Sequence, residues 1–344
     1  MRLKIFQEAA MPLAGHKPPM DEEATLAARA AWLYFAGGRT QGEVAEELNV
    51  ASTKAHRLIA KATRDGLIRV FVEGPMAGCI TLEDELKRRF GLTHCEVVPN
   101  VDDGPLPLRT LGTAGARYIR HALDRGQDKV IALGHGRTLA ASIDFMPSVS
   151  SPGVKFVSLL GGLTRRFSAN PFDVIQRLAE KTGAEGYLLP VPFFANSISD
   201  KKVLLNQLGI GDVLELADAA SLLVVGIGEA SANGFLHVAG MVGAEEIEAV
   251  KSAGAVGELL GHFFALDGCH IPNGLSDRAL APDLKRLRGR RIAAIAGGTT
   301  KVPAIRSILA SELLHGLITD ETTAIELIAT TSEQDAANKN RRTG

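Results

Sequence analysis

The 344-residue sequence has few cysteines, no long apolar run and almost no excess of charge of either sign. Its three cysteines, Cys79, Cys95 and Cys269, form no C-x-x-C pair, so we expect three buried thiols in a protein of a reducing compartment. No segment approaches the roughly 20 apolar residues that cross a bilayer, and residues 1–20 lack the apolar core of a signal peptide. These features predict a cytoplasmic protein without a membrane partner.

A net charge of −1 gives the whole chain no attraction for nucleic acid, so a DNA-binding function must rest on local charge. A hydrophobic content of 46% with 22% charged residues excludes disorder, collagen and coiled coil for the bulk of the chain. The length predicts about two domains. We expect a small helical domain over residues 21–78 and a large domain over 79–330, with flexible tails over 1–20 and 331–344.

Residues 21–66 have the apolar spacing of three short helices. Thr40, followed three residues later by Glu43, predicts a capping box at the start of the second helix. Ser52 is expected to cap the third helix. Inward-facing positions of that third helix are Ala55, Leu58, Ile59 and Ala62.

The second and third helices have the spacing of a helix-turn-helix, with Asn49 at the turn position that requires a left-handed backbone. Residues 52–70 carry five basic side chains and one acidic one, whereas residues 21–51 carry two basic and six acidic ones. The segment 67–72 alternates like a strand and predicts a wing. A three-helix structural cap with a solvated basic face is the alternative. The predicted DNA-contacting residues are Gln41, Ser52, Thr53, Lys54, His56, Arg57 and Lys61.

Beyond Gly78 the sequence alternates between apolar strands and helices, which predicts a parallel α/β sheet. The expected strands are residues 96–98, 129–133, 155–160, 222–225 and 291–295. The expected helices are residues 111–123, 138–145, 172–181, 245–252 and 302–314. In open parallel sheets, ligands bind at the carboxyl ends of the strands.

The sharpest motif of the large domain is Gly134-His135-Gly136-Arg137-Thr138, which follows a strand and opens a helix. Glycines let the backbone approach a ligand, and the N–H groups of a helix start attract an anion. The motif is weak evidence by itself, because tight turns need glycine anyway. It is neither the dinucleotide fingerprint nor a Walker loop, so no cofactor is expected.

Other strand ends are expected to converge on this motif, namely Gly161-Gly162, residues 225–228 and residues 297–301 with Lys301. Asp267 and Asp277 are candidate carboxylate ligands, with turn or cap residues as the alternative. A solvated helix start is the alternative for Lys301.

Neither a metal site nor a catalytic residue is predicted. His262, Cys269 and His270 lack the spacing of metal ligands and are expected in loops and packing. His135 has no nucleophile or orienting partner near it in the sequence.

Ordered segments through both predicted domains share their sequences with a known family, namely residues 31–35, 40–45, 82–92, 133–139, 254–261, 275–278 and 297–302. By these segments the chain resembles the SorC family of sugar-binding, DeoR-like transcriptional regulators from about Leu26 to about Leu327. The resemblance implies a winged helix-turn-helix followed by a Rossmann-like effector domain similar to sugar-phosphate isomerases. It also implies a homodimer or homotetramer that binds a double-stranded DNA operator.

The resemblance further implies an effector that is a sugar, a polyol or a sugar phosphate. By position, its contacts fall on Gly134, Gly136, Thr138, Gly161, Gly162, Asp277 and Lys301. The chain departs from the family at His135, where an aromatic residue is common, and at Thr300, where an acid often stands.

Three functions therefore compete. The first is a transcriptional regulator, expected to be a repressor, of a carbohydrate or polyol catabolic operon. The second is a sugar-phosphate isomerase or deaminase with an accessory N-terminal domain, which would need more carboxylates near the substrate than the sequence offers. The third is a sugar-sensing scaffold that no longer binds DNA.

Overall fold

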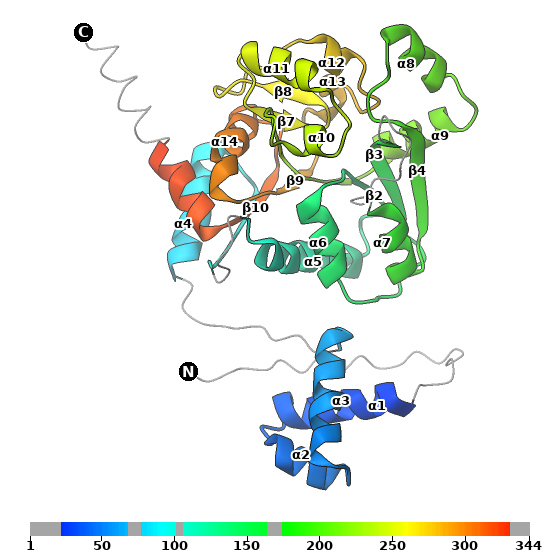
Figure 1. The fold of residues 1–344 in the computed structure, drawn as a ribbon, viewed down its shortest axis with the longest axis vertical. Helices are drawn as coiled ribbons and strands as arrows, with labels where there is room; N and C mark the ends of the chain where they lie inside the picture. Colours follow the sequence, from blue (N-terminus) through cyan, green and yellow to red (C-terminus); the bar gives the residue numbers. More distant parts are fainter. Residues whose placement is uncertain (1–21, 68–76, 101–105, 164–173, 331–344) are drawn as a thin grey trace. The chain divides into compact units, whose positions relative to one another are not determined.

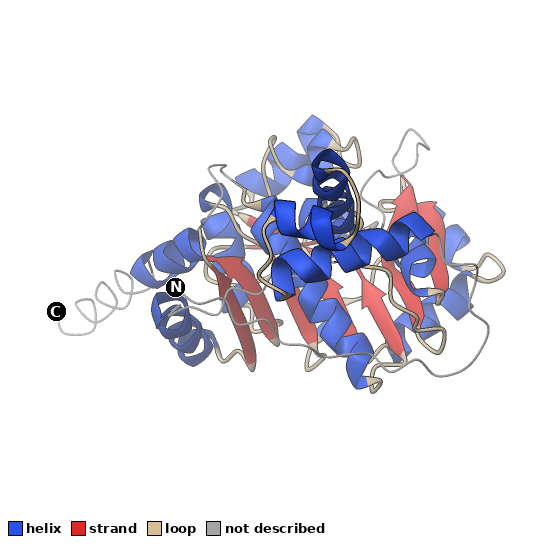
Figure 2. Ribbon diagram, turned by 90° about the horizontal axis from the view of Figure 1, so that it is seen from below, coloured by secondary structure: helices blue, strands red, loops and turns tan. Residues whose placement is uncertain are grey.

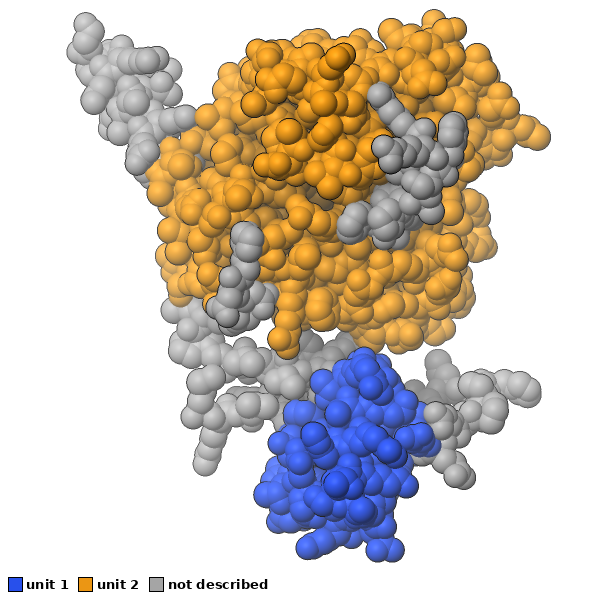
Figure 3. All heavy atoms as spheres, in the orientation of Figure 1, with its two compact units in different colours: residues 1–76 blue, residues 77–344 orange. Residues whose placement is uncertain are grey.

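The computed structural model describes residues 22–67, 77–100, 106–163 and 174–330. The chain divides into two compact units, residues 1–76 and 77–344, which Figure 3 colours separately. Both predicted tails lie outside the described residues, and so does the predicted wing apart from Leu67.

The first unit is helical, as predicted (Figure 1). The capping box is confirmed, because the Glu43 amide donates to the Thr40 hydroxyl at 3.3 Å and the Thr40 amide donates to the Glu43 carboxylate at 2.7 Å. Asn49 takes the left-handed conformation expected of it, with φ of 50°. The helices are α1 (Glu22–Ala31), a π-helical turn (Trp32–Ala36), α2 (Gln41–Glu47) and α3 (Ser52–Arg64).

The predicted cap of α3 is wrong. Ala51 holds the extended backbone of the cap position, and Ser52 is the first helical residue. The inward face of α3 is as predicted, since its apolar side chains join those of α1 and α2 in one core. The buried members from α3 are Ala55, Leu58, Ile59 and Ala62.

The second unit is an α/β domain built on a seven-stranded parallel sheet of order β1-β10-β9-β5-β2-β3-β4. Its strands are β1 (His94–Val98), β2 (Val130–Leu133), β3 (Lys155–Leu163), β4 (Glu185–Pro192), β5 (Leu222–Val225), β9 (Ile292–Ile295) and β10 (Gly316–Asp320). From β2 the chain winds to β3 and β4 on one side, whereas β5, β9 and β10 lie on the other. The direction of winding therefore reverses between β2 and β5.

Helices cover both faces of the sheet (Figure 2). On one face, Leu111, Leu139 and Leu178 pack with strand residues such as Phe156 and Ile295 in one buried cluster. The helices are α4 (Ala77–Phe90), α5 (Leu108–Arg125), α6 (Arg137–Phe145), α7 (Ile175–Thr182), α8 (Ile198–Leu205), α9 (Ile210–Ala219), α11 (Ala244–Ser252) and α14 (Val302–Ala310).

A small antiparallel sheet and several one-turn helices complete the unit between β5 and α14. The sheet consists of β6 (Gly228–Glu229), β7 (Gly257–Leu259) and β8 (His262–Phe264). The short helices are α10 (Phe235–Val238), α12 (Gly274–Asp277), α13 (Leu284–Leu287) and the 3-10 turn η2 (Thr299–Lys301).

Some elements depart from prediction. The strands β4 and β10 were not expected, and α14 ends at Ala310 instead of continuing to residue 314. The sequence of β4 carries Pro192 within an apolar run, which is tolerated because β4 is an edge strand. Cys79 and Cys95 are buried as predicted, but Cys269 is exposed.

Candidate functional site

A pocket lies at the carboxyl ends of β2 and β5, where the winding of the sheet reverses. Residues 134–138 line it from the end of β2, and residues 226–228 line it from the end of β5. Leu133 pairs with Val224 in register, so the two strand ends open at the same edge. Open parallel sheets bind ligands at such a reversal, which makes this pocket the candidate ligand site.

The turn after β2 brings backbone and hydroxyl groups to the pocket. Gly136 has φ of 138°, a conformation that strains any residue with a Cβ, and it precedes the first turn of α6. The Thr138 hydroxyl, predicted to be a ligand donor, donates instead to the Ile295 carbonyl oxygen at 2.7 Å. Its lone pairs can still accept a hydrogen bond, while its proton ties α6 to β9.

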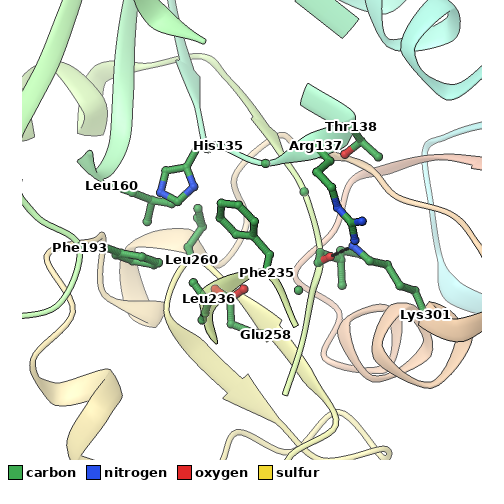
Figure 4. Close-up of a pocket in the computed structure, with 15 residues that line it drawn as sticks. His135, Arg137, Thr138, Leu160, Phe193, Phe235, Leu236, Glu258, Leu260 and Lys301 are labelled. Carbon is green, nitrogen blue, oxygen red and sulfur yellow. Dashed lines mark hydrogen bonds between the residues drawn. The ribbon is translucent and has the colours of Figure 1, made fainter. Parts of the chain in front are cut away.

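Lys301 reaches the same pocket from the loop after β9. Its Nζ donates to the Ile227 carbonyl oxygen at 2.8 Å, which leaves two of its three N–H groups for other acceptors. Burial, and next the positive charge of Arg137, lower the pKa of Lys301. Figure 4 shows the Arg137 guanidinium directed towards the Lys301 side chain. Two cations therefore face one region of the pocket.

Glu258, in β7, supplies a carboxylate that the sequence did not reveal. Its Oε1 accepts a hydrogen bond from the Gly261 amide at 2.6 Å. Burial raises the pKa of Glu258 to about 7, against smaller opposing effects of the Gly261 amide hydrogen bond and of the Lys301 charge. The carboxyl group is thus poised between its charged and neutral forms near neutral pH.

An aromatic wall closes the other part of the pocket. The His135 ring lies 5.5 Å from the Phe193 ring and 5.7 Å from the Phe235 ring, measured between centroids. Leu160 and Leu260 lie beside them in Figure 4. The phenylalanines have no motif around them, and Glu258 stands within the segment 254–261 that carried only the family resemblance. Their roles therefore had no local signal.

The glycines predicted at the end of β3 do not line this pocket. Gly161 lies inside β3, which continues past it, and a Cβ there would meet the Pro192 carbonyl oxygen at 2.2 Å. Its role is to let β3 and β4 approach closely. Gly162 follows in the same strand, and β3 contributes Leu160 to the pocket instead.

The two predicted carboxylates also lie away from the pocket lining. Asp267 is exposed, and its Oδ1 accepts a hydrogen bond from the Cys269 amide at 2.9 Å, as in a turn. Asp277 is exposed at the end of α12. Asp267 is therefore a turn residue and Asp277 a helix-end residue, as in the alternative interpretation. Among the predicted ligand residues, the lining comprises Gly134, His135, Gly136, Arg137, Thr138 and Lys301.

A second candidate site is the outer face of α3 in the first unit. Six of the predicted DNA-contacting residues are exposed, namely Gln41 on α2 and Ser52, Thr53, Lys54, His56 and Arg57 on the face of α3 opposite its buried side chains. Lys61 is partly buried, and its Nζ pairs with the Asp65 carboxylate at 2.8 Å. The exposed cations of the first two turns are therefore better placed than Lys61 to meet a phosphate.

No group of three or more histidine, cysteine or acidic side chains in residues 22–67, 77–100, 106–163 and 174–330 is arranged to hold a metal ion. No helix among the same residues has the length and apolar character needed to cross a membrane.

The sequence is similar to a known protein family and to named transcriptional regulators. The family model Sugar-bind, a sugar-binding domain, matches residues 74–329. The erythritol catabolism regulatory protein EryD of Brucella abortus (strain 2308) is 48% identical over 308 residues, which are 90% of this chain and 98% of EryD. The transcriptional regulator LsrR of Enterobacter sp. (strain 638) is 32% identical over 312 residues, covering 89% of this chain and 94% of LsrR.

The fold is shared with a solved regulator. The full-length sorbitol operon regulator SorC of Klebsiella pneumoniae aligns with a TM-score of 0.68 over 90% of this chain and 100% of that chain, at 24% sequence identity. The alignment spans both units of the present structure.

Proposed function

The chain belongs to the SorC family of sugar-binding, DeoR-like transcriptional regulators, and on this premise we propose that it represses a polyol catabolic operon under the control of an effector bound in the pocket at β2 and β5. The proposed effector is a polyol such as erythritol, or its phosphate, because the 48% identical relative is named as a regulatory protein of erythritol catabolism.

The observation that carries the proposal is the mixture of groups around the pocket. Arg137 and Lys301 offer positive charge, Glu258 offers a carboxylate, and the start of α6 offers backbone N–H groups. A polyhydroxy ligand, with or without a phosphate, requires donors and acceptors of this kind together. The position of the pocket at the winding reversal supports the same interpretation.

The DNA-binding part of the proposal rests on α3. Its exposed residues, including Lys54 and Arg57, would meet the major groove and its phosphates. A helix-turn-helix protein commonly reads two half-sites about one helical turn apart, so we propose that the chain acts in the cytoplasm as a homodimer or homotetramer. The effector would bind one arrangement of the subunits more tightly than another and so change DNA affinity.

A gel-shift experiment tests this function. The DNA is the region upstream of the chain's own operon, and the competitors are erythritol, longer polyols and their phosphates. We expect a specific complex without ligand and its loss with at least one competitor. Unrelated DNA of equal length is the control. The proposal is contradicted if the upstream DNA binds no better than the control.

One observation favours catalysis as a second candidate. Glu258 has a pKa of about 7 and lies in the pocket with Lys301, as an acid or base of a sugar-phosphate isomerase would. We nevertheless propose binding without turnover, because the relatives are named as transcriptional regulators. Incubation with tetrose and pentose phosphates, followed by NMR, distinguishes the two: conversion that Glu258→Gln abolishes would establish the enzyme.

A further inference from the structure

His135 carries two buried polar atoms that have no hydrogen-bond partner among the described residues. Neither Nδ1 nor Nε2 accepts or donates a hydrogen bond to any residue in the described part of the chain, and both are inaccessible to solvent. The ring is nevertheless part of the pocket lining, beside Phe193 and Phe235. Buried polar groups in proteins are nearly always paired, so an unpaired one that borders a ligand pocket points to pairing by the ligand.

The protonation state of His135 limits which ligand group can pair with it. Burial lowers the pKa of His135 to about 4, so the ring is neutral at pH 7 and offers one donor and one acceptor. A hydroxyl group can both donate and accept, and can therefore pair with either nitrogen. A phosphate dianion only accepts, so it can pair with the protonated nitrogen alone, whereas two hydroxyl groups of a polyol can pair with both nitrogens.

The positive charges of the pocket, on Arg137 and Lys301, lie away from His135. In Figure 4 the Phe235 ring lies between His135 and the side chains of Arg137 and Lys301. The residues beside His135 in that view are the apolar Leu160 and Phe193. An anionic group is therefore favoured near the two cations and disfavoured against the aromatic wall.

We propose that His135 is a specificity-determining residue that binds uncharged hydroxyl groups of the effector. The effector then lies with its polyol chain against His135 and with any anionic group towards Arg137 and Lys301. This inference rests on the proposed function of the pocket as the effector site.

Calorimetric titration of the full chain tests the inference, with erythritol, ribitol and sorbitol as probes. His135→Phe keeps an aromatic ring and removes both nitrogens, whereas His135→Gln restores one donor and one acceptor. We expect His135→Phe to weaken polyol binding about 10- to 100-fold, because a hydroxyl group of the polyol loses its hydrogen-bond partner. The loss is limited because Glu258 and the backbone groups of the pocket remain. His135→Gln should retain more of the affinity than His135→Phe.

His270→Phe is the matched control. The Nε2 of His270 is also buried and has no hydrogen-bond partner in the part of the chain that the structure describes. Because His270 is outside the pocket lining, its replacement should leave polyol affinity unchanged. If His135→Phe binds the polyols as tightly as the wild type, the inference is overturned while the effector site stands. If the wild type binds neither these polyols nor their phosphates, the proposed effector site and the inference both fail.

A measurement on the wild type does not depend on the ligand affinity of a variant. With ¹⁵N-labelled histidine, saturation with the polyol should shift the ring-nitrogen resonances of His135, which are identified by their loss in His135→Gln. Resonances that stay in place while calorimetry records binding would also overturn the inference.

Discussion

The Nζ of Lys301 donates a hydrogen bond to the Ile227 carbonyl oxygen at 2.8 Å. This bond joins the loop after β9 to the loop after β5, the two strand ends that flank one another in the sheet. Lys301 is thereby held at the pocket by one N–H group, with two more available to a ligand. The bond joins two of the strand ends that were expected to converge, residues 225–228 and residues 297–301.

Replacing Lys301 should discriminate between charged and neutral effectors. Lys301→Met keeps the length and apolar stem of the side chain but removes the charge. We expect a loss of about 10- to 100-fold in affinity for a phosphorylated polyol and a smaller loss for the neutral polyol, because hydrogen bonds to charged groups are the stronger ones. Calorimetry with both ligands measures the difference, with the exposed Lys285→Met as control. Equal losses for both ligands would refute a phosphate contact at Lys301.

Replacing Arg57 should weaken operator binding without changing effector binding. Arg57 is exposed on α3, where it would contact a phosphate or a base edge. If it contacts a phosphate, Arg57→Ala lowers the salt dependence of DNA binding by about one released counterion per subunit. Anisotropy titrations at several salt concentrations measure this change. Arg29→Ala, on the exposed face of α1, is the control, and an Arg57→Ala affinity equal to it would contradict the assignment of α3.

The stability of the second unit should fall in mild acid because of His135. In the folded chain its pKa is about 4, against an ordinary value of 6.5, so between these values the unfolded chain binds a proton that the folded chain does not. Stability is therefore lost as the pH falls through this window. The loss from this group is about 2 kcal/mol at pH 5 relative to pH 7.5.

Urea unfolding of wild type and His135→Phe at the two pH values checks this expectation. The other titratable groups of the chain, including His94 and His262, are present in both proteins, so their contributions cancel in the comparison. The wild type should lose more stability than the variant between pH 7.5 and pH 5. Equal losses would show that His135 is not buried in its neutral form.

The two units should respond separately to a core substitution in the first. Leu58 is 1% exposed and packs among α1, α2 and α3. Leu58→Ala should cost about 2 to 5 kcal/mol, a large part of the stability of so small a unit. Because the first unit unfolds, Leu58→Ala should lose operator binding. Its effector affinity, measured by calorimetry, should equal that of the wild type. Leu67→Ala, at a position 52% exposed, should leave both functions intact, and loss of effector binding in Leu58→Ala would contradict independent units.

Much of the fold was predictable because its signals are local. The capping box at Thr40, the left-handed Asn49 and the inward face of α3 each depend on residues a few positions apart. The strand β4 was missed because its prolines obscure the pattern of an edge strand. Ser52 is a good capping residue by type, but the chain enters the helix one residue earlier.

The pocket was predictable where glycines and a cation follow strands, as at residues 134–138 and at Lys301. Glu258 and Phe193 enter it from distant segments, and only the tertiary fold brings them there. Asp267 was predicted to line the pocket but does not, because its carboxylate accepts a hydrogen bond within its own turn. The chemical type of a side chain can be read from the sequence, but its hydrogen-bond partner depends on the tertiary fold.

The central claim is that occupation of the pocket changes the affinity of the chain for its operator. The most direct measurement is the dissociation constant of the wild-type chain for fluorescent operator DNA, with and without a saturating polyol whose binding calorimetry has established. Coupling free energies between sites predict a change of about 5- to 150-fold, which His135→Phe should reduce at the same polyol concentration. An operator affinity that is the same with and without the bound polyol would contradict the claim.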